Sequence, residues 1–144
     1  MHVVREYRLK RRVQFHETDA AGIVHFSWFY RYMEEAEHGL WRAAGLSIAP
    51  SSDARVGFPR VAASFDFHRP LRFEDEFEVH IRIATIGARS IRYAVCVAKD
   101  GAAVATGSLT VACVAWTPGA ALRSTAIPPE IAGRFGVALP LPDA

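Results

Sequence analysis

One aspartate stands between a strand-like segment and a helix-like segment, where a carboxylate could do chemistry. The residues around Asp19, positions 15–26, read FHETDAAGIVHF. Gly22 lacks a Cβ, which lets the backbone approach a ligand closely or adopt a positive φ. A carboxylate in such a turn can attack a carbonyl carbon or activate a water molecule. The alternative is a turn or helix-capping acid that accepts hydrogen bonds from nearby N–H groups.

The predicted helix that follows offers a second chemical element. The first turn of an α-helix leaves about four backbone N–H groups unpaired and carries a partial positive charge. It can therefore polarise a carbonyl without a side-chain acid. Residues 23–27 lie at such an end, just after Asp19. Glu17 shares the face of Asp19 by strand parity, and we expect it to face solvent or to support Asp19 from behind.

Hydrophobic periodicity predicts the elements that position this turn. Residues 7–15 alternate between apolar and polar side chains, which is typical of a strand with one buried face. Residues 27–44 have helical spacing, and Gly45 is placed to end that helix. Residues 46–57 show no period and are expected to form a loop. Further strands are predicted at 61–67, 77–83, 91–97 and 103–116, and a short helix is expected within 127–135.

This order predicts an α+β fold in one domain that spans residues 1–144. Five strands form an antiparallel sheet that wraps around one long central helix. Composition agrees, because 144 residues with 51% hydrophobic content provide enough apolar material for one core.

Charge and composition exclude several classes of function. A net charge of +2, with basic residues scattered among 15 acids, does not favour nucleic-acid binding. Cys96 and Cys113 lie in apolar runs and are expected to be reduced packing residues. No segment has the ~18–20 apolar residues of a membrane span, and the charged start resembles no signal peptide. We therefore expect a cytoplasmic protein that does not enter membranes.

The Asp-Ala-Ala-Gly-Ile-Val string at 19–24, placed before a long helix, resembles the active-site segment of the 4-hydroxybenzoyl-CoA thioesterase family. These are hotdog-fold acyl-CoA hydrolases, so the resemblance implies the hotdog arrangement of sheet and helix. It matches Asp19 to the family's catalytic Asp and the backbone N–H of Phe26 to the thioester-oxygen donor, with Gly22 between them. His25 departs from the family's usual aromatic residue; it is expected to shape the acyl pocket, to donate to the substrate, or simply to pack.

The implied activity is hydrolysis of an aryl or medium-chain acyl-CoA to the free acid and CoA. Asp19 acts as nucleophile or general base, and these two roles stay open. Thiolate is a good leaving group, so no strong general acid is required. No cofactor is expected, because CoA is part of the substrate. No metal is expected either, since the histidines lack ligand spacing, and no Gly-x-Ser-x-Gly elbow of a serine hydrolase occurs.

Two sets of residues are candidates for substrate binding. Trp28 and Phe29 could line the acyl pocket, although core packing also explains them. Arg89 resembles the family's phosphate-binding residue in a turn between strands, with Arg92 as a weaker candidate. Ala88 stands where the family often has another basic residue, so phosphate contacts could also come from Arg69, Arg72 or a neighbouring subunit.

Rival functions and the assembly state complete the predictions. A hotdog hydratase or dehydratase is disfavoured, because five residues separate Asp19 from His25 and its motif has a shorter spacing. A non-catalytic acyl-CoA-binding module also stays open, since fold does not determine function. One small sheet around one helix leaves strand edges and an open cleft, so a homodimer or homotetramer is expected.

Overall fold

Alternating apolar residues build the main sheet of this chain, which a computed structural model describes for residues 2–49 and 55–140. Its five strands are antiparallel and lie in the order β1-β4-β5-β6-β3. Their bounds are β1 Glu6–Arg12, β3 Arg60–Phe67, β4 Glu76–Ile86, β5 Ser90–Lys99 and β6 Ala102–Ala112. Asp100 and Gly101 join β5 to β6 with φ angles of 50° and 77°, which suit a tight hairpin turn.

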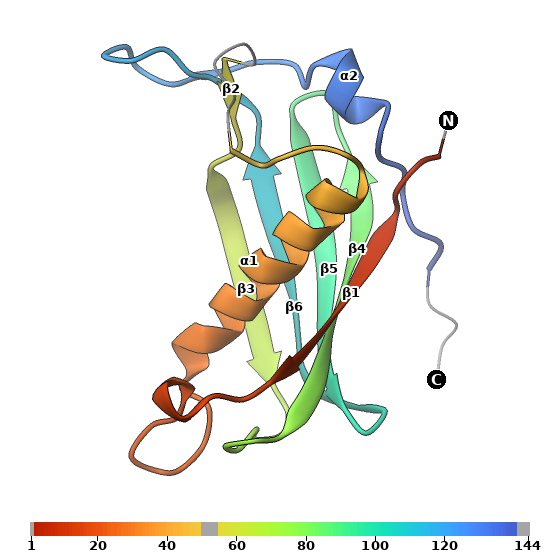
Figure 1. Cartoon of the computed structure of the whole chain (residues 1–144). Helices are drawn as coiled ribbons and strands as arrows, with labels where there is room; N and C mark the ends of the chain where they lie inside the picture. Colours follow the sequence, from red (N-terminus) through yellow and green to blue (C-terminus); the bar gives the residue numbers. More distant parts are fainter. Residues whose placement is uncertain (1, 50–54, 141–144) are drawn as a thin grey trace.

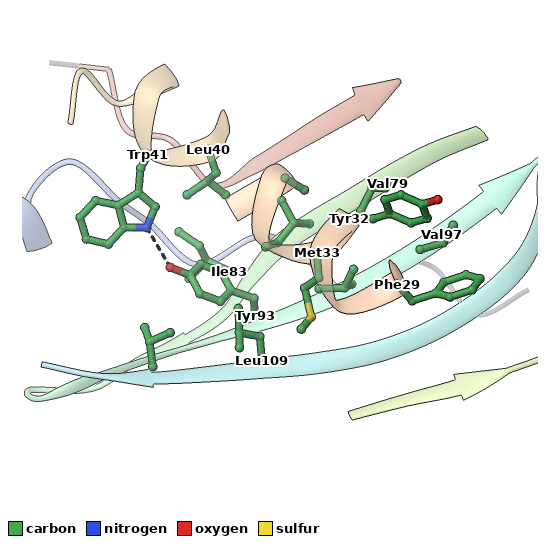
Figure 2. Packing of buried hydrophobic residues seen from close by; sticks show 14 of the residues in the cluster. Phe29, Tyr32, Met33, Leu40, Trp41, Val79, Ile83, Tyr93, Val97 and Leu109 are labelled. Carbon is green, nitrogen blue, oxygen red and sulfur yellow. Dashed lines mark hydrogen bonds between the residues drawn. The ribbon is translucent and has the colours of Figure 1, made fainter. Parts of the chain in front are cut away.

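The helix α1 (Phe26–Ala43) lies across the concave face of this sheet (Figure 1). Its buried side chains point toward inward residues of β4, β5 and β6, which together form the core (Figure 2). Burying one large apolar side chain, such as Leu, Ile, Phe or Met, contributes about 1.5–3 kcal/mol of hydrophobic stabilisation. Trp41 also donates from its indole N–H to the hydroxyl of Tyr93 at 2.9 Å, so both polar atoms have a partner inside the core.

The helix ends where predicted, and its close contact with β1 depends on a second glycine. Gly45 has a φ of +76°, the left-handed conformation that commonly follows a helix. A Cβ on Gly39 would come within 2.3 Å of the ring of Tyr7, so only glycine allows β1 this close to α1.

Smaller elements cover the end of the sheet near the C-terminus of α1. β2 (Val56–Gly57), β7 (Val114–Ala115) and β8 (Arg123–Ser124) form a second sheet in the order β2-β7-β8. The helix α2 (Pro129–Ala132) follows, and residues 134–136 then run beside Val4 ahead of β1.

Several predicted boundaries were wrong. The first strand ends at Arg12, and Phe15 lies in the 3-10 helix η1 (Phe15–Glu17) with 74% of its surface exposed. The run 103–116 divides into β6 and β7. The short helix expected within 127–135 is confirmed as α2, which has four residues. The predicted loop 46–57 contains β2, and its residues 50–54 lie outside the described part of the chain.

The two edges of the main sheet differ in chemistry. β1 places charged Arg8, Lys10 and Arg12 along its exposed face, a pattern that discourages pairing with another strand. β3 has exposed apolar Val61 and Phe67, and in the described residues only β6 pairs with it. The β3 edge is therefore an unprotected apolar edge. No helix among the described residues is long and apolar enough to cross a membrane.

Candidate active site

The turn that carries Asp19 is closed by hydrogen bonds of its own backbone. Asp19 N–H donates to the Ile23 carbonyl at 2.9 Å, and Gly22 N–H donates to the Asp19 carbonyl at 2.9 Å. Gly22 has a φ of +80°, which a residue with a Cβ rarely adopts. The turn therefore requires a glycine at this position.

The carboxylate of Asp19 has one occupied oxygen and one available oxygen. Its Oδ1 accepts from Ala21 N–H at 2.8 Å and from Ile23 N–H at 3.4 Å. Within the described residues, Oδ2 accepts no hydrogen bond from the protein. Asp19 is half-buried. It thus stabilises the turn, as the capping interpretation requires, and still leaves an oxygen for chemistry.

His25 caps the N-terminus of α1. Its Nδ1 accepts from Ser27 N–H at 3.3 Å and lies 2.8 Å from Ser27 Oγ, while its carbonyl accepts from Trp28 N–H at 2.9 Å. Across the described part of the chain, Phe26 N–H has no acceptor. His25 therefore occupies the next two N–H groups, which is a structural role, and it leaves the N–H of Phe26 available to a ligand.

Asp19 and Phe26 line one hollow with a volume of about 580 Å³, within the range of small-molecule sites. Its remaining lining comes from the Asp19 turn, the start of α1, the end of β3 and the segment after β3, namely Ala21, Ile23, Val24, Phe29, Phe67, His68, Arg69, Pro70, Leu71 and Arg72. Two segments far apart in sequence meet here because Val24 N–H donates to the Leu71 carbonyl at 2.8 Å.

The candidate acyl-binding aromatics are placed differently from one another. Phe29 is 3% exposed and lines the hollow, where it packs edge-to-face on Phe67 with ring centroids 5.1 Å apart. Trp28 is not part of the lining and packs instead against His16 and Tyr32. Sequence reasoning missed Phe67; its parity with Phe65 at the end of a strand was the available signal.

Glu17 does not face solvent, so the first of its two expected placements was wrong, and the placement behind Asp19 is the one that stays open. It is 0% exposed, and its carboxylate accepts from Tyr32 OH at 2.8 Å, from Gln14 N–H at 2.9 Å and from Arg11 at 2.7 Å. Burial acts to raise the pKa of Glu17, but these hydrogen bonds and the charge of Arg11 outweigh it and lower the pKa. This buried network fixes the chain immediately before the Asp19 turn.

Arg89 and Arg92 lie at the opposite end of the sheet. Asp19 is beside the segment that enters β4, whereas Arg89 follows the end of β4; this strand has 11 residues and spans about 36 Å at ~3.3 Å per residue. Figure 1 shows the start and the end of β4 at opposite ends of the sheet. Nη1 of Arg89 donates to Ser124 Oγ at 3.4 Å, next to Arg123 on β8. Within one chain, therefore, neither arginine reaches the Asp19 hollow.

Other basic side chains do lie at the hollow. Arg69 and Arg72 are exposed members of its lining, and among the described residues neither side chain forms an ion pair. The described residues also contain no cluster of three or more His, Cys, Asp or Glu that could hold a metal ion.

Comparison with known proteins places this geometry in a family. The sequence profile of the Thioesterase-like superfamily matches residues 13–135, which include the Asp19 turn, the helix α1 and the main-sheet strands β3, β4, β5 and β6, but not β1. The chain belongs to this superfamily. The enzyme is accordingly a hydrolase of the thioesterase type.

Relatives and solved structures agree with the assignment. The crystal structure of a hypothetical protein from Aquifex aeolicus has a TM-score of 0.82 and 31% identity, covering 90% of this chain and 99% of that chain. The structure of a gentisyl-coenzyme A thioesterase has a TM-score of 0.77 and 29% identity, covering 87% of this chain and 98% of that chain. A 1,4-dihydroxy-2-naphthoyl-CoA hydrolase of Synechococcus elongatus is 27% identical, over 76% of this chain and 82% of that protein. The predicted hotdog fold is confirmed, whereas the narrower 4-hydroxybenzoyl-CoA family stays a prediction.

Proposed function

We propose that this enzyme hydrolyses an acyl-CoA thioester to the free acid and CoA, with Asp19 as the reacting carboxylate. One observation carries the proposal: the available oxygen of Asp19 and the available N–H of Phe26 line the same hollow. A thioester carbonyl bound to Phe26 N–H places its developing negative charge at the positive end of α1.

Two reaction routes use the same groups. In the first, an Asp19 oxygen attacks the carbonyl carbon, the carbon–sulfur bond breaks to release CoA thiolate, and water then hydrolyses the acyl–Asp19 anhydride. In the second, Asp19 takes a proton from a water molecule as that water attacks, and the thiolate leaves in turn. Both routes yield the same products, and both require a carboxylate at position 19. Gly22 contributes by holding the turn, and His25 by capping the helix.

The acyl group we favour is aromatic. Phe26, Phe29 and Phe67 give the hollow ring-lined walls, and flat rings pack well edge-to-face or offset against such walls. The relatives named above as gentisyl-CoA and 1,4-dihydroxy-2-naphthoyl-CoA enzymes take ring-bearing acyl groups by their names. A medium-chain aliphatic acyl group is the alternative occupant of the same apolar space.

The unprotected edge of β3 favours a homodimer. Pairing two β3 strands about a two-fold axis perpendicular to the sheet makes them antiparallel and keeps both α1 helices on one face. It satisfies the unpaired backbone groups of the edge and covers part of the surface of Val61 and Phe67. A tetramer would require a further interface beyond this edge.

In this dimer, the partner's Arg89 lies within reach of a CoA thioester bound in the Asp19 hollow. Because the two paired β3 strands run in opposite directions, the start of the partner's β3 lies beside the end of β3, and the start of the partner's β5 lies at the same end of the partner's sheet. The partner's β5 is then three strand spacings from β3, about 14 Å at ~4.8 Å each. The pantetheine arm that separates the thioester from the CoA phosphates is of comparable length. We therefore assign the partner's Arg89 to the phosphates, while Arg69 and Arg72 lie closer to the reacting end.

The test is thiol release from a panel of CoA thioesters, with benzoyl-CoA and octanoyl-CoA as the matched aromatic and aliphatic pair. Steady turnover with an aromatic preference is expected. Saturable binding without turnover would instead identify an acyl-CoA-binding module, and hydration of an enoyl-CoA without thiol release would identify a hydratase.

Mixed dimers test whether the site is shared. Asp19→Asn chains are combined with Arg89→Ala chains carrying a different affinity tag, and the heterodimers are purified. A shared site restores one complete site per heterodimer, so hydrolysis at low substrate should approach half the wild-type rate. If each chain supplies its own Arg89, no site is complete and the rate stays at or below that of the Arg89→Ala homodimer.

A further inference from the structure

A hairpin arm extends from the second sheet and carries apolar residues into solvent. Its base is the pairing of β7 with β8, where Thr125 N–H also donates to the carbonyl of buried Cys113 at 3.0 Å. At its tip, Ala120 N–H donates to the Thr117 carbonyl at 3.1 Å across Pro118 and Gly119, with Gly119 at a φ of +79°. Pro followed by a positive-φ Gly is the sequence of a type II turn, so the arm is preformed.

The surface of the arm resembles that of a protein–protein interface, because its large apolar side chains are exposed to solvent. All residues from 116 to 124 are exposed, and they include Trp116 at 46% and Leu122 at 57%. Residues 116–122 read WTPGAAL and contain no charge, so covering them would bury no ion. Large apolar side chains on an uncharged projecting hairpin indicate an interaction surface.

The position of the arm identifies the occupant. β7 pairs with β2, which directly precedes β3, so the arm lies at the starting end of the bare edge (Figure 1). In the antiparallel two-fold pairing of β3, that end of one chain meets the finishing end of the other. The finishing end carries the rim of the Asp19 hollow, where Phe26 is 60% and Phe67 is 48% exposed. One symmetry operation thus brings the exposed apolar residues of the arm next to the exposed apolar rim of the partner's hollow.

We propose that the arm of each protomer packs on the Phe26 and Phe67 rim of its partner and closes the mouth of the partner's hollow. This inference rests on the β3-edge dimer proposed above. The arm then excludes water from the acyl group and leaves open the CoA path along the sheet of the protomer that carries the arm, toward that protomer's Arg89. Its function is to make substrate binding depend on a second copy of the chain.

Photo-cross-linking tests the contact without any need for activity. The photoreactive amino acid p-benzoylphenylalanine replaces Leu122, and these chains are mixed with unsubstituted chains labelled with nitrogen-15. Irradiation should yield a covalent dimer in which position 122 is joined to a labelled peptide containing Phe26 or Phe67. Cross-links confined to the same chain, to other surfaces, or absent from the dimer would overturn the proposal.

Kinetics with a matched control then test the closing role. Trp116→Ser with Leu122→Ser should raise KM for aromatic acyl-CoA about fivefold or more, since truncating a buried interface anchor costs more than about 1 kcal/mol. Sedimentation should still show a dimer. Leu139→Ser removes another exposed apolar side chain, 84% exposed, and should leave KM unchanged. If the chains substituted at position 122 cross-link as expected but the wild-type protein hydrolyses no thioester, the proposed activity is refuted and the arm contact is not. An unchanged KM in the double variant would refute closure.

Discussion

Replacing Asp19 with Asn separates the two roles that the structure gives this residue. The amide oxygen of Asn can still accept from Ala21 N–H and Ile23 N–H, which now bond to Oδ1 at 2.8 and 3.4 Å. The turn should therefore persist, and the free energy of unfolding should change by only a few tenths of a kcal/mol. An amide is neither a useful nucleophile nor a base, so kcat should fall at least about 100-fold, the scale for a lost acid–base group.

Asp19→Ala provides the contrast, because it removes the turn acceptor together with the carboxylate. It should lose kcat to a similar extent and also about 1 kcal/mol of stability, the typical value of a local capping hydrogen bond. Glu130→Gln is the matched control: it neutralises an exposed carboxylate on α2, at the other end of the molecule, and should change neither quantity.

The assay measures three quantities on each purified variant: thiol release from an aromatic acyl-CoA, affinity for a non-hydrolysable thioether analogue, and thermal unfolding. Asp19→Asn should bind and unfold like the wild type while turning over slowly. Near-normal turnover by this variant would refute the mechanism, and a loss of stability equal to that of Asp19→Ala would refute the account of the turn.

Three further changes test other parts of the structure. Arg89→Ala should raise KM for CoA thioesters and change kcat less, because distant phosphate contacts hold substrate and transition state alike. If activity falls equally on CoA thioesters and on pantetheine thioesters, which lack those phosphates, Arg89 instead supports the fold. Glu17→Gln should cost about 1.5–3 kcal/mol of stability at neutral pH, since it weakens a charged hydrogen-bond network. Because the pKa of Glu17 is lowered in the folded protein, its contribution to stability is complete above its ordinary pKa of 4.5 and is lost as pH falls through the lowered value. Thermal unfolding at acidic pH should therefore show a smaller stability difference between the wild type and Glu17→Gln. Val61→Glu places a charge on the bare β3 edge and should yield a 15.9 kDa monomer by sedimentation, whereas a stable dimer would refute the β3 interface.

Local chemistry explains which predictions were confirmed. The helix was predicted within one residue at each end, because Gly45 takes the positive φ that ends it and the apolar residues recur on one face. The first strand was overextended to Phe15, since alternation of apolar residues continues past the point where Glu17 accepts from Gln14 N–H and turns the backbone. Pattern alone cannot register a side chain that captures the backbone in this way.

For the candidate site, the sequence by itself determined what is contiguous. Asp19, Gly22 and Phe26 lie within eight residues, so their turn and helix start form from local backbone preferences. The tertiary structure decided everything that depends on packing between distant segments. It placed Phe67 beside Phe29, buried Glu17 under Tyr32, and set Arg89 at the far end of an 11-residue strand. These placements follow from strand order and burial, which are properties of the whole chain and leave no signal at a single position.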